Sequence, residues 1–343
     1  MARLKEYNGH YCESEYEYAF IGFLEAEGWK YSSGNNISRV TKRDVLIADD
    51  FKKFIADTNP DLTEDEVTKI YDNVRLVGAE SDFATLHKVY GWMVNGVQFT
   101  PQDELPRMIP LIDFDNWNKN IFRVVNQFTV EYTNNGQKEN RRPDVLLFVN
   151  GIPLCVIELK NPTDANATIY DAWEQINIRY WRDIPHLLHY CPLACISDGV
   201  KTRLGTVRTP YEHFYAWRRV NEGDAVSTLP FAETETMIKG VYSPERFLEI
   251  FRDYIYFQDS IYDSDEQEIV CRYPQFFATR LLKQSIIKSV VEKSGKGGTY
   301  FGATGCGKTY TMAFLARQLA LRCTDIPEDR KSTRLNSSHP SIS

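Results

Sequence analysis

Two carboxylates and a lysine lie within one short stretch, RPDVLLFVNGIPLCVIELK, between Arg142 and Lys160. Asp144 opens a first apolar run, and Glu158 interrupts a second run two residues before Lys160. A polar group in a buried strand costs free energy unless it is satisfied, so these residues call for a function. Divalent Mg²⁺ prefers oxygen ligands, and an ammonium group can stabilise a hydroxide or a developing phosphoryl charge. The pattern predicts a magnesium site at Asp144 and Glu158 with Lys160 beside it; the alternative is a Glu–Lys surface pair on an edge strand.

The two apolar runs are joined through Asn150-Gly151, a typical hairpin turn. Side chains alternate along a strand, so the register decides whether the two carboxylates share a face. A plain two-residue turn would pair Asp144 with Ile157 and send the carboxylates to opposite faces. A three-residue turn with Gly151 in a left-handed bulge would bring them together. Pro153 cannot donate to a ladder and also favours irregular pairing. A shared metal therefore requires a bulge, which we expect at the turn.

A second chemical motif, GATGCGKT, satisfies the phosphate-loop pattern GxxxxGK[ST] in full. It follows an expected short strand and opens an expected helix, which is the context the pattern needs. Backbone amides would cradle phosphates, Lys308 would reach the β and γ oxygens, and the Thr309 hydroxyl would bind magnesium. The motif predicts ATP binding by Gly302, Thr304, Gly305, Cys306, Gly307, Lys308 and Thr309.

The composition fits a globular enzyme of two domains. The 343 residues can form two cores, and no run of about 18 apolar residues predicts a membrane span. The first residues, MARLKEYNGHYCESEYEY, lack the apolar centre of a signal peptide. The seven cysteines are scattered without CxxC spacing, which argues against a disulfide framework or a zinc site. We expect a cytoplasmic protein with reduced thiols, in which Cys191 and Cys195 pack in the core.

The formal net charge of −7 argues against a generally basic surface but does not exclude DNA binding, because local patches carry phosphate contacts. Two basic clusters stand out, and ordinary solvated faces explain them equally well. The first is Lys138, Arg141 and Arg142, and the second is Lys201, Arg203, Arg208, Arg218 and Arg219, interleaved with Tyr211, Tyr215 and Trp217.

Periodicity and capping signals divide the chain into expected elements. Helices are expected at Glu13–Glu27, Ala48–Ala56, Thr63–Asn73, Thr168–Arg182, Glu245–Phe257, Gln275–Lys293 and Thr309–Arg322. Strands are expected at Asp82–Phe99, Asn120–Tyr132, both arms of the hairpin, Leu193–Ile196 and Thr299–Phe301, with a polar loop at Thr133–Arg142 and a linker at Asn221–Lys239. The order strand, hairpin, helix, strand is that of a small α/β nuclease core with a mixed sheet. Glu17 could reach the metal face from the first helix, but a solvated helical charge is favoured.

The last residues differ from the rest, because DRKSTRLNSSH matches a common sequencing adapter translated in frame. We interpret residues 329–343 as an assembly artefact and expect the natural chain to continue beyond residue 328. The predicted organisation is a nuclease domain at 1–220, a linker and connecting helix at 221–265, and the truncated start of a motor domain at 266–328.

These motifs together resemble the restriction (R) subunit of type I restriction-modification enzymes, over Glu13–Cys323. PDVLLFVNGIPLCVIELKNP is similar to that family's PD-(D/E)xK nuclease signature, LIDFDNWNKNIFRVVNQFTVE to the run before it, and GATGCGKT to its first helicase motif. The resemblance implies an α/β fold, in which a PD-(D/E)xK domain with a mixed sheet precedes the start of a RecA-like, parallel-sheet motor. It also implies cleavage of double-stranded DNA, with Asp144 and Glu158 binding Mg²⁺ and Lys160 as the catalytic lysine. Gln275 would lie where such motors contact adenine, although an ordinary helix residue explains Gln275 equally well.

The same resemblance implies ATP-driven translocation of duplex DNA in a complex with modification (methyltransferase) and specificity subunits. One departure concerns the family's Gln-x3-Tyr pair, since Gln175 and Tyr180 are here separated by four residues. Five positions turn a helix by about 140° beyond a full turn, so these catalytic candidates share a face only if the helix contains a bulge.

Three other functions remain open at this stage. A repair-type nuclease-helicase would carry both motifs and would differ in its downstream chain and subunits. A small-molecule kinase or NTPase would use the phosphate loop but leave Asp144, Glu158 and Lys160 without a role. A DNA-binding scaffold with an inactive site would need only the basic clusters.

Overall fold

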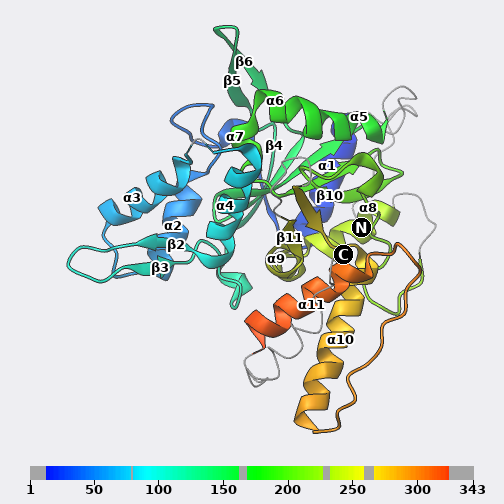
Figure 1. Cartoon of the computed structure of the whole chain (residues 1–343). Helices are drawn as coiled ribbons and strands as arrows, with labels where there is room; N and C mark the ends of the chain where they lie inside the picture. The colour runs from blue at the N-terminus through cyan, green and yellow to red at the C-terminus, as the bar shows by residue number, and fades with distance from the viewer. Residues whose placement is uncertain (1–12, 79, 162–167, 227–231, 259–265, 324–343) are drawn as a thin grey trace.

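A mixed six-stranded sheet forms the centre of the protein in the computed structural model, which describes residues 13–78, 80–161, 168–226, 232–258 and 266–323 (Figure 1). The β1–β4 and β8–β9 pairs are parallel, and the β4–β7, β7–β8 and β9–β10 pairs are antiparallel. This confirms the predicted α/β class and mixed sheet. The strands in spatial order are β1 (Lys30–Ser33), β4 (Phe122–Asn126), β7 (Val145–Val149), β8 (Ile152–Leu159), β9 (Leu193–Ser197) and β10 (Thr202–Thr206).

The hairpin arms β7 and β8 are the two central strands, and every residue in them is buried. Strands covered on both faces have nearly continuous apolar sequences rather than alternating ones, which explains the runs VLLFV and IPLCVIEL. The helix α1 (Glu13–Ala26) contacts β4 and β8, and α5 (Ile169–Glu174) contacts β8 and β9. The edge-strand alternative for the Glu158–Lys160 pair is therefore wrong.

The amino-terminal helices occur where the sequence predicts them. After α1 come α2 (Ala48–Thr58) and α3 (Glu64–Arg75). The α3 helix begins with a capping box, in which Thr63 and Glu66 satisfy each other's backbone amides. The start of α2 touches the central hairpin, because the Ile47 amide donates to the Gly151 carbonyl at 2.8 Å. The turn between β7 and β8 is thus hydrogen-bonded to the start of α2.

The segment predicted as a strand at Asp82–Phe99 is mostly helix α4 (Asp82–Asn95), and that prediction is wrong. The Ser81 hydroxyl caps the helix by accepting from the Ala84 amide. Its buried residues recur at helical spacing and include Phe83, Leu86, Val89, Tyr90 and Met93. Only β2 (Val97–Phe99) is extended, and it pairs with β3 (Arg107–Ile109).

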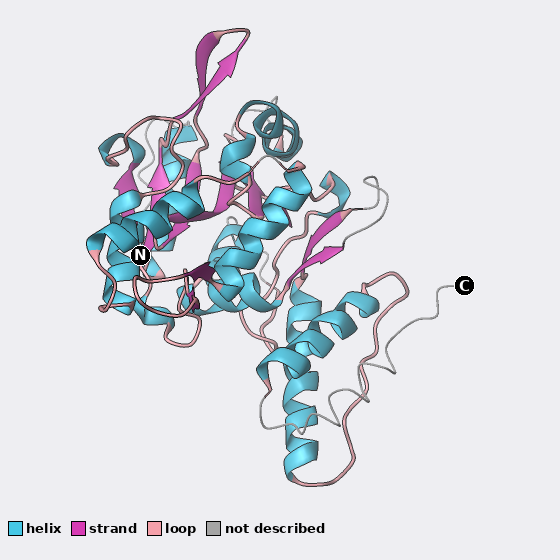
Figure 2. Ribbon diagram, turned by 60° about the vertical axis from the view of Figure 1, so that its left-hand side comes forward, coloured by secondary structure: helices cyan, strands magenta, loops and turns pink. Residues whose placement is uncertain are grey.

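The single strand predicted at Asn120–Tyr132 is two strands, β4 and β5 (Val130–Asn134). The break lies at Gln127, whose φ of 56° is incompatible with an extended strand. The predicted loop Thr133–Arg142 instead contains the end of β5 and all of β6 (Gln137–Arg141). Asn135-Gly136 turns this hairpin with both residues at positive φ, and the hairpin projects from the body of the protein (Figures 1 and 2).

The predicted linker Asn221–Lys239 also contains structure. Its second part forms α8 (Ala232–Met237) and a π-helical turn, Ile238–Tyr242. The Thr202 amide donates to the Glu233 carboxylate at 3.0 Å, and the Thr202 and Thr234 hydroxyls lie 2.7 Å apart. The low apolar content was misleading, because polar side chains attach this helix to β10.

The carboxyl-terminal part extends away from the body (Figures 1 and 2). The predicted helix Glu245–Phe257 ends earlier, since α9 (Pro244–Asp253) is followed by β11 (Ile255–Gln258), which pairs with β12 (Gln267–Val270). The helices α10 (Tyr273–Val291) and α11 (Lys308–Arg322) confirm two predictions and pack on each other.

The strand predicted at Thr299–Phe301 is not formed, and Phe301 is 89% exposed. A buried parallel strand needs neighbours on both sides, and no strand of the described chain lies beside this segment to pair with it. Residues 329–343 lie outside the described residues. The remaining short helices are α6 (Trp181–Asp183), α7 (Pro185–Leu188) and the 3-10 turns Gly34–Asn36, Trp117–Lys119 and Tyr211–His213. Within the described ranges no helix has the length and apolar character needed to cross a membrane.

Candidate functional site

The central hairpin contains the register shift that a shared carboxylate site requires. Its turn is a plain two-residue one, with Asn150 at φ 51° and Gly151 at φ 76°. The shift occurs further along, where Phe148 pairs with Pro153 but Leu147 pairs with Cys155. The predicted bulge therefore exists, but its predicted position at the turn is wrong. Proline has no amide to donate, so the ladder is interrupted where Pro153 lies.

The bulge brings the two acidic residues opposite each other. Val145 pairs with Ile157, so the next position in this register places Asp144 opposite Glu158. The two carboxyl groups lie within hydrogen-bonding reach of each other, and the Asp144 Oδ2 also accepts from the Leu159 amide at 2.8 Å. The structure thus brings together the two residues that the sequence predicts as a pair.

Glu158 has no exposed surface, and burial raises its pKa well above the ordinary range. The neighbouring Asp144 charge raises the pKa further, whereas Lys160 and the Tyr180 hydroxyl lower it. Burial also raises the pKa of Asp144, against the opposing Leu159 amide bond. Two adjacent carboxyls in a poorly solvated place repel each other when both are charged, so the pair holds a proton or needs a cation.

The helix after β8 supplies two further groups through a π-helical turn, Gln175–Tyr180. Its wider turn places Gln175 and Tyr180 on one face, as the sequence requires for a five-residue separation. The Tyr180 hydroxyl donates to the Glu158 Oε1 at 2.5 Å, and the Gln175 Nε2 donates to the Glu158 Oε2 at 2.7 Å. The Gln175 Oε1 accepts from the Lys160 Nζ at 2.9 Å, so one amide joins the acid to the lysine.

This oxygen-rich pair fits the magnesium ion that the sequence predicts. The donor set is two carboxylates, which are hard ligands suited to Mg²⁺, and their mutual repulsion would be relieved by a divalent charge. Across the described part of the chain, no three His, Cys, Asp or Glu side chains are grouped to hold a metal. An ion here would be held by Asp144 and Glu158 and would complete its shell with other oxygens.

The sequence interpretation underestimated Glu17. This residue of α1 is 6% exposed rather than solvated, and its carboxylate accepts from the Asn126 amide at 2.5 Å. Burial raises the pKa of Glu17, and the charge of Asp144 raises it further, so the two acids interact electrostatically. The apolar neighbours of Glu17 in α1 were the available signal, because a fully solvated helix face carries few aromatic residues.

A chain of buried hydroxyls under the lysine was also missed. The Lys160 amide donates to the Ser197 carbonyl at 2.8 Å. The Ser197 hydroxyl lies 2.7 Å from both the Tyr16 and the Thr202 hydroxyls. No motif marks these residues in the sequence, because they are brought together by the parallel β8–β9 pair and by packing of α1.

The phosphate loop is a formed but largely exposed structure. Gly305 and Gly307 both have φ of 80°, and Gly307 directly precedes α11. The Lys308 Nζ donates to the Gly302 and Ala303 carbonyls at 2.8 and 2.9 Å, so it folds back across the loop. The predicted phosphate ligands therefore form one loop at a helix start; Thr304 and Thr309 are exposed.

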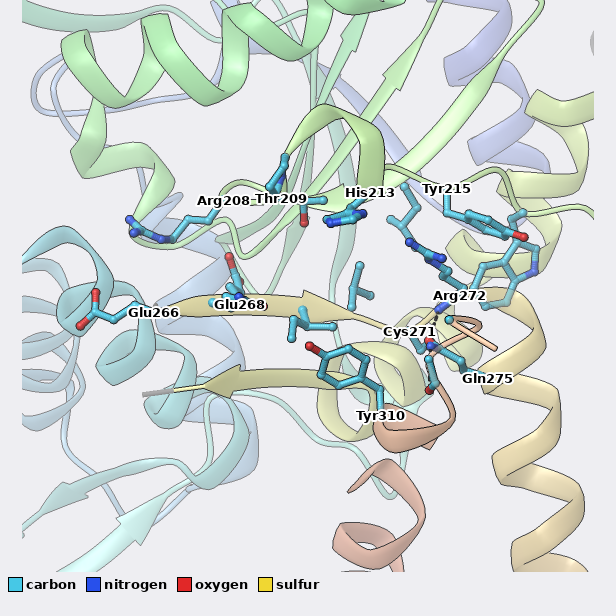
Figure 3. Close-up of a pocket in the computed structure, with 18 residues that line it drawn as sticks. Arg208, Thr209, His213, Tyr215, Glu266, Glu268, Cys271, Arg272, Gln275 and Tyr310 are labelled. Carbon is cyan, nitrogen blue, oxygen red and sulfur yellow. Dashed lines mark hydrogen bonds between the residues drawn. The ribbon is translucent and has the colours of Figure 1, made fainter. Parts of the chain in front are cut away.

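Gln275, which the resemblance places where such motors contact adenine, is buried against this loop. Its Nε2 donates to the Gly307 carbonyl at 3.3 Å, and its Oε1 accepts from the Arg272 amide at 2.8 Å. Gln275 and the loop form one wall of a 410 Å³ cavity (Figure 3). The other walls come from β12 and from the segment around His213.

The basic clusters are mostly engaged in local contacts. The Lys138 Nζ lies 2.9 Å from Glu131, and the Arg141 guanidinium lies 2.7 Å from Asp183. In the second cluster Trp217 is 1% exposed and thus unavailable to a partner, and Arg208 lies over the rings of Phe83 and Trp181. These contacts favour the structural interpretation. Cys191 and Cys195 are buried free thiols, as predicted.

Comparison with known proteins identifies the family. Residues 11–213 match the family described as "Type I restriction enzyme R protein N terminus". The chain is 31% identical over 331 residues to a putative type I restriction enzyme MjaIXP endonuclease subunit of Methanocaldococcus jannaschii, covering 88% of this chain and 31% of that protein. It is 29% identical over 324 residues to the type I restriction enzyme HindI endonuclease subunit of Haemophilus influenzae, covering 90% of this chain and 30% of that protein.

The chain thus spans less than a third of the length of these relatives. The family match covers the central sheet, the hairpin and the helix that carries Gln175 and Tyr180. It therefore includes every residue of the carboxylate site described above. The chain belongs to the family of type I restriction enzyme R proteins.

Proposed function

We propose that this chain is the DNA-cleaving part of a type I restriction endonuclease subunit, with a PD-(D/E)xK nuclease site at Asp144, Glu158 and Lys160. The observation that carries the proposal is the hydrogen-bonded set at the central hairpin, in which Gln175 joins Glu158 to Lys160. Its relatives are endonuclease subunits by name. Double-stranded DNA is the proposed substrate.

The residues have separable roles in phosphodiester hydrolysis. Bound Mg²⁺ would lower the pKa of a water and offset phosphate charge, and Asp144 and Glu158 would hold it. Lys160 would stabilise the negative charge that develops on the phosphate, because its ammonium is held near both acids by the Gln175 amide. Gln175 and Tyr180 are positioning residues, since their contacts fix the orientation of Glu158.

Nicking of supercoiled plasmid by this chain tests the nuclease proposal. We expect nicking that needs Mg²⁺ and is lost in Asp144→Asn, which keeps the size of the side chain but removes its charge. Asp57→Asn is the matched control, because Asp57 is an exposed carboxylate on α2 that pairs with Lys53. If the chain assembled with its partner subunits, ATP and unmodified DNA also fails to cut, the nuclease proposal is wrong.

We further propose that the phosphate loop binds ATP and Mg²⁺ and begins a RecA-like motor that drives DNA translocation in the complete subunit. The positive-φ glycines and the lysine at the start of α11 support phosphate binding. Modification and specificity subunits are the proposed partners. A repair-type nuclease-helicase is the second candidate, and co-purification of this subunit with a methyltransferase would decide against it.

A further inference from the structure

A three-residue connection brings one member of the first basic cluster to the carboxylate site. Arg142, Pro143 and Asp144 join the projecting β5–β6 hairpin to the central strand β7 (Figure 1). Any side chain of this connection therefore lies within two residues of an acid of the candidate site. Arg142 has no role in the site described so far.

The other two basic residues of this cluster already have acidic partners. The Lys138 Nζ lies 2.9 Å from Glu131 on the facing strand of the hairpin. The Arg141 Nε donates to the Asp183 Oδ2 at 2.7 Å. Arg142 is different, because its side chain is exposed and has no hydrogen bond or ion pair with any residue that the structure describes. It is the member of the cluster that is available to a partner.

The backbone on both sides of Arg142 is fixed. Pro143 is buried, and a proline restricts the residue before it to extended conformations. Successive side chains of an extended chain point to opposite sides, so the contact of Arg141 with α6 directs Arg142 the other way. On that side burial raises the pKa of Glu17 and of Asp144, and the Arg142 charge lowers both. The guanidinium thus lies near the two acids without pairing with either.

A DNA backbone that approaches this site meets unfavourable charge. Asp144 and Glu158 repel phosphates, and the half-buried Lys160 donates to the Gln175 amide oxygen. Phosphate contacts from exposed cations supply most of the affinity of proteins for DNA. A guanidinium matches a phosphate with two parallel hydrogen bonds, and a fixed backbone lowers the entropy lost when its side chain is ordered. Arg142 has this chemistry and this position.

We propose that Arg142 binds a backbone phosphate of duplex DNA next to the phosphate that is cleaved, and so holds the DNA over Asp144. This inference rests on the proposed function, the cleavage of double-stranded DNA at the carboxylate site. Arg142 is a positioning residue, because it contacts the DNA outside the reacting phosphate. Its contact is the same before and during the reaction, whereas Lys160 acts on the charge that develops.

The salt dependence of DNA binding tests the proposal. Anisotropy of a fluorescein-labelled duplex would be measured with this chain in about 50–200 mM salt, without divalent ions, which compete for phosphates. The slope of log affinity against log salt changes by about 0.9 for each phosphate neutralised, so Arg142→Gln should make the slope shallower by about that amount. It should also weaken binding by about tenfold at the lowest salt, as for one hydrogen bond to a charged group. Arg142→Lys keeps the charge and should keep the slope.

Nicking kinetics with Mg²⁺ separate binding from chemistry. Arg142→Gln should raise the KM for supercoiled plasmid by about tenfold and leave kcat within about threefold, because the contact stabilises the bound substrate and the transition state equally. Arg218→Gln is the matched control. Arg218 belongs to the second basic cluster, is exposed, and likewise has no ion pair within the described ranges. This control should keep the slope, the affinity and the KM of the parent chain.

Failure of this inference differs from failure of the proposed function. If the assembled complex with ATP and unmodified DNA does not cut, the nuclease proposal is wrong and the role of Arg142 falls with it. If the complex cuts, the role of Arg142 is wrong when the parent chain does not bind the duplex, when Arg142→Gln keeps the parent slope and KM, or when Arg218→Gln loses as much. A lower kcat at unchanged slope and KM would show that Arg142 acts on the acids rather than on DNA, and would overturn the inference as well.

Discussion

The hairpin and the phosphate loop are both built on left-handed glycines, but they depend on the rest of the protein to very different extents. The hairpin turn at Gly151 contacts α2, and Glu158 at the other end of β8 has no exposed surface. The phosphate loop is exposed from Gly302 to Gly305, and its lysine donates to two carbonyls of the loop itself. The geometry of the first site is fixed by distant packing, whereas that of the second is fixed by a local turn and a helix start.

The difference extends to charge. At the hairpin, two acids with raised pKa values face one lysine, so the site carries excess negative charge or a retained proton before any metal binds. At the loop, a cation faces backbone carbonyls that would have to release it to phosphate. We therefore expect the first site to bind a cation and the second an anion. Single substitutions should reveal this contrast.

The largest expected effect is on catalysis at the hairpin. Lys160→Ala should lower the rate of plasmid nicking by about 10³-fold, the scale of losing a preorganised charge stabiliser. Lys53→Ala, which removes an exposed lysine paired with Asp57, should leave nicking unchanged. Rates would be measured with Mg²⁺ in excess, so that weaker metal binding does not contribute. Nicking within threefold of the parent chain would remove Lys160 from the mechanism.

A pair of glycine substitutions tests the structural side of the comparison. A Cβ at Gly151 would collide with the Ile47 carbonyl and lie 2.9 Å from the Phe51 nitrogen, whereas one at Gly305 would meet nothing within 4 Å. Both residues have positive φ, so Gly305→Ala carries the backbone cost alone. We expect Gly151→Ala to lower the free energy of unfolding by about 3 kcal/mol or more, and Gly305→Ala by about 1 kcal/mol. Equal losses in urea denaturation would show that packing over the hairpin turn does not matter.

The sequence predicts which residues of the hairpin come together better than it predicts the surrounding fold. Asp144, Glu158 and Lys160 could be identified because their chemistry conflicts with the apolar strands that contain them. The need for a bulge and for a π-helical turn follows from the sequence, because a regular strand pairing and a regular helix would put the predicted partners on different faces. The position of the bulge does not follow from the sequence, because it depends on whether Gly151 or Pro153 interrupts the ladder.

Two of the differences between sequence prediction and structure lie where the sequence carries local signals. The helix α4 was taken for a strand, although Ser81 and the spacing of Phe83, Leu86 and Met93 were visible signals. Glu17 is buried rather than solvated, and the aromatic residues beside it in α1 were the corresponding signal. The domain boundaries stay predictions.

The pH dependence of stability should distinguish the acidic site. Glu158 titrates near 4.5 when unfolded and higher when folded, so above pH 4.5 the folded chain binds more protons than the unfolded one. The free energy of unfolding of the metal-free protein therefore falls as the pH rises from 4.5 through the raised pKa. Glu158→Gln removes this loss and should be more stable at neutral pH by about 1–3 kcal/mol, the scale of the desolvation penalty of a buried polar group. Thermal melts at pH 5 and pH 7 would measure it, and a variant advantage that shrinks toward pH 7 would contradict the prediction.

The smallest expected effect concerns Tyr180, which acts on the site only through Glu158. Tyr180→Phe removes the hydroxyl that donates to the Glu158 Oε1 and accepts from the Gln175 Nε2, while the buried ring stays in place. The lost donor stabilised the charged acid, so the pKa of Glu158 should rise further and the pH at which nicking begins should move upward. At neutral pH we expect nicking to slow by about tenfold, as for one buried hydrogen bond to a charged group. At high pH the parent rate should return, because Glu158 is then ionised in both proteins. A loss that is equal at every pH would show that Tyr180 supports the fold of the π-helical turn rather than the charge of Glu158.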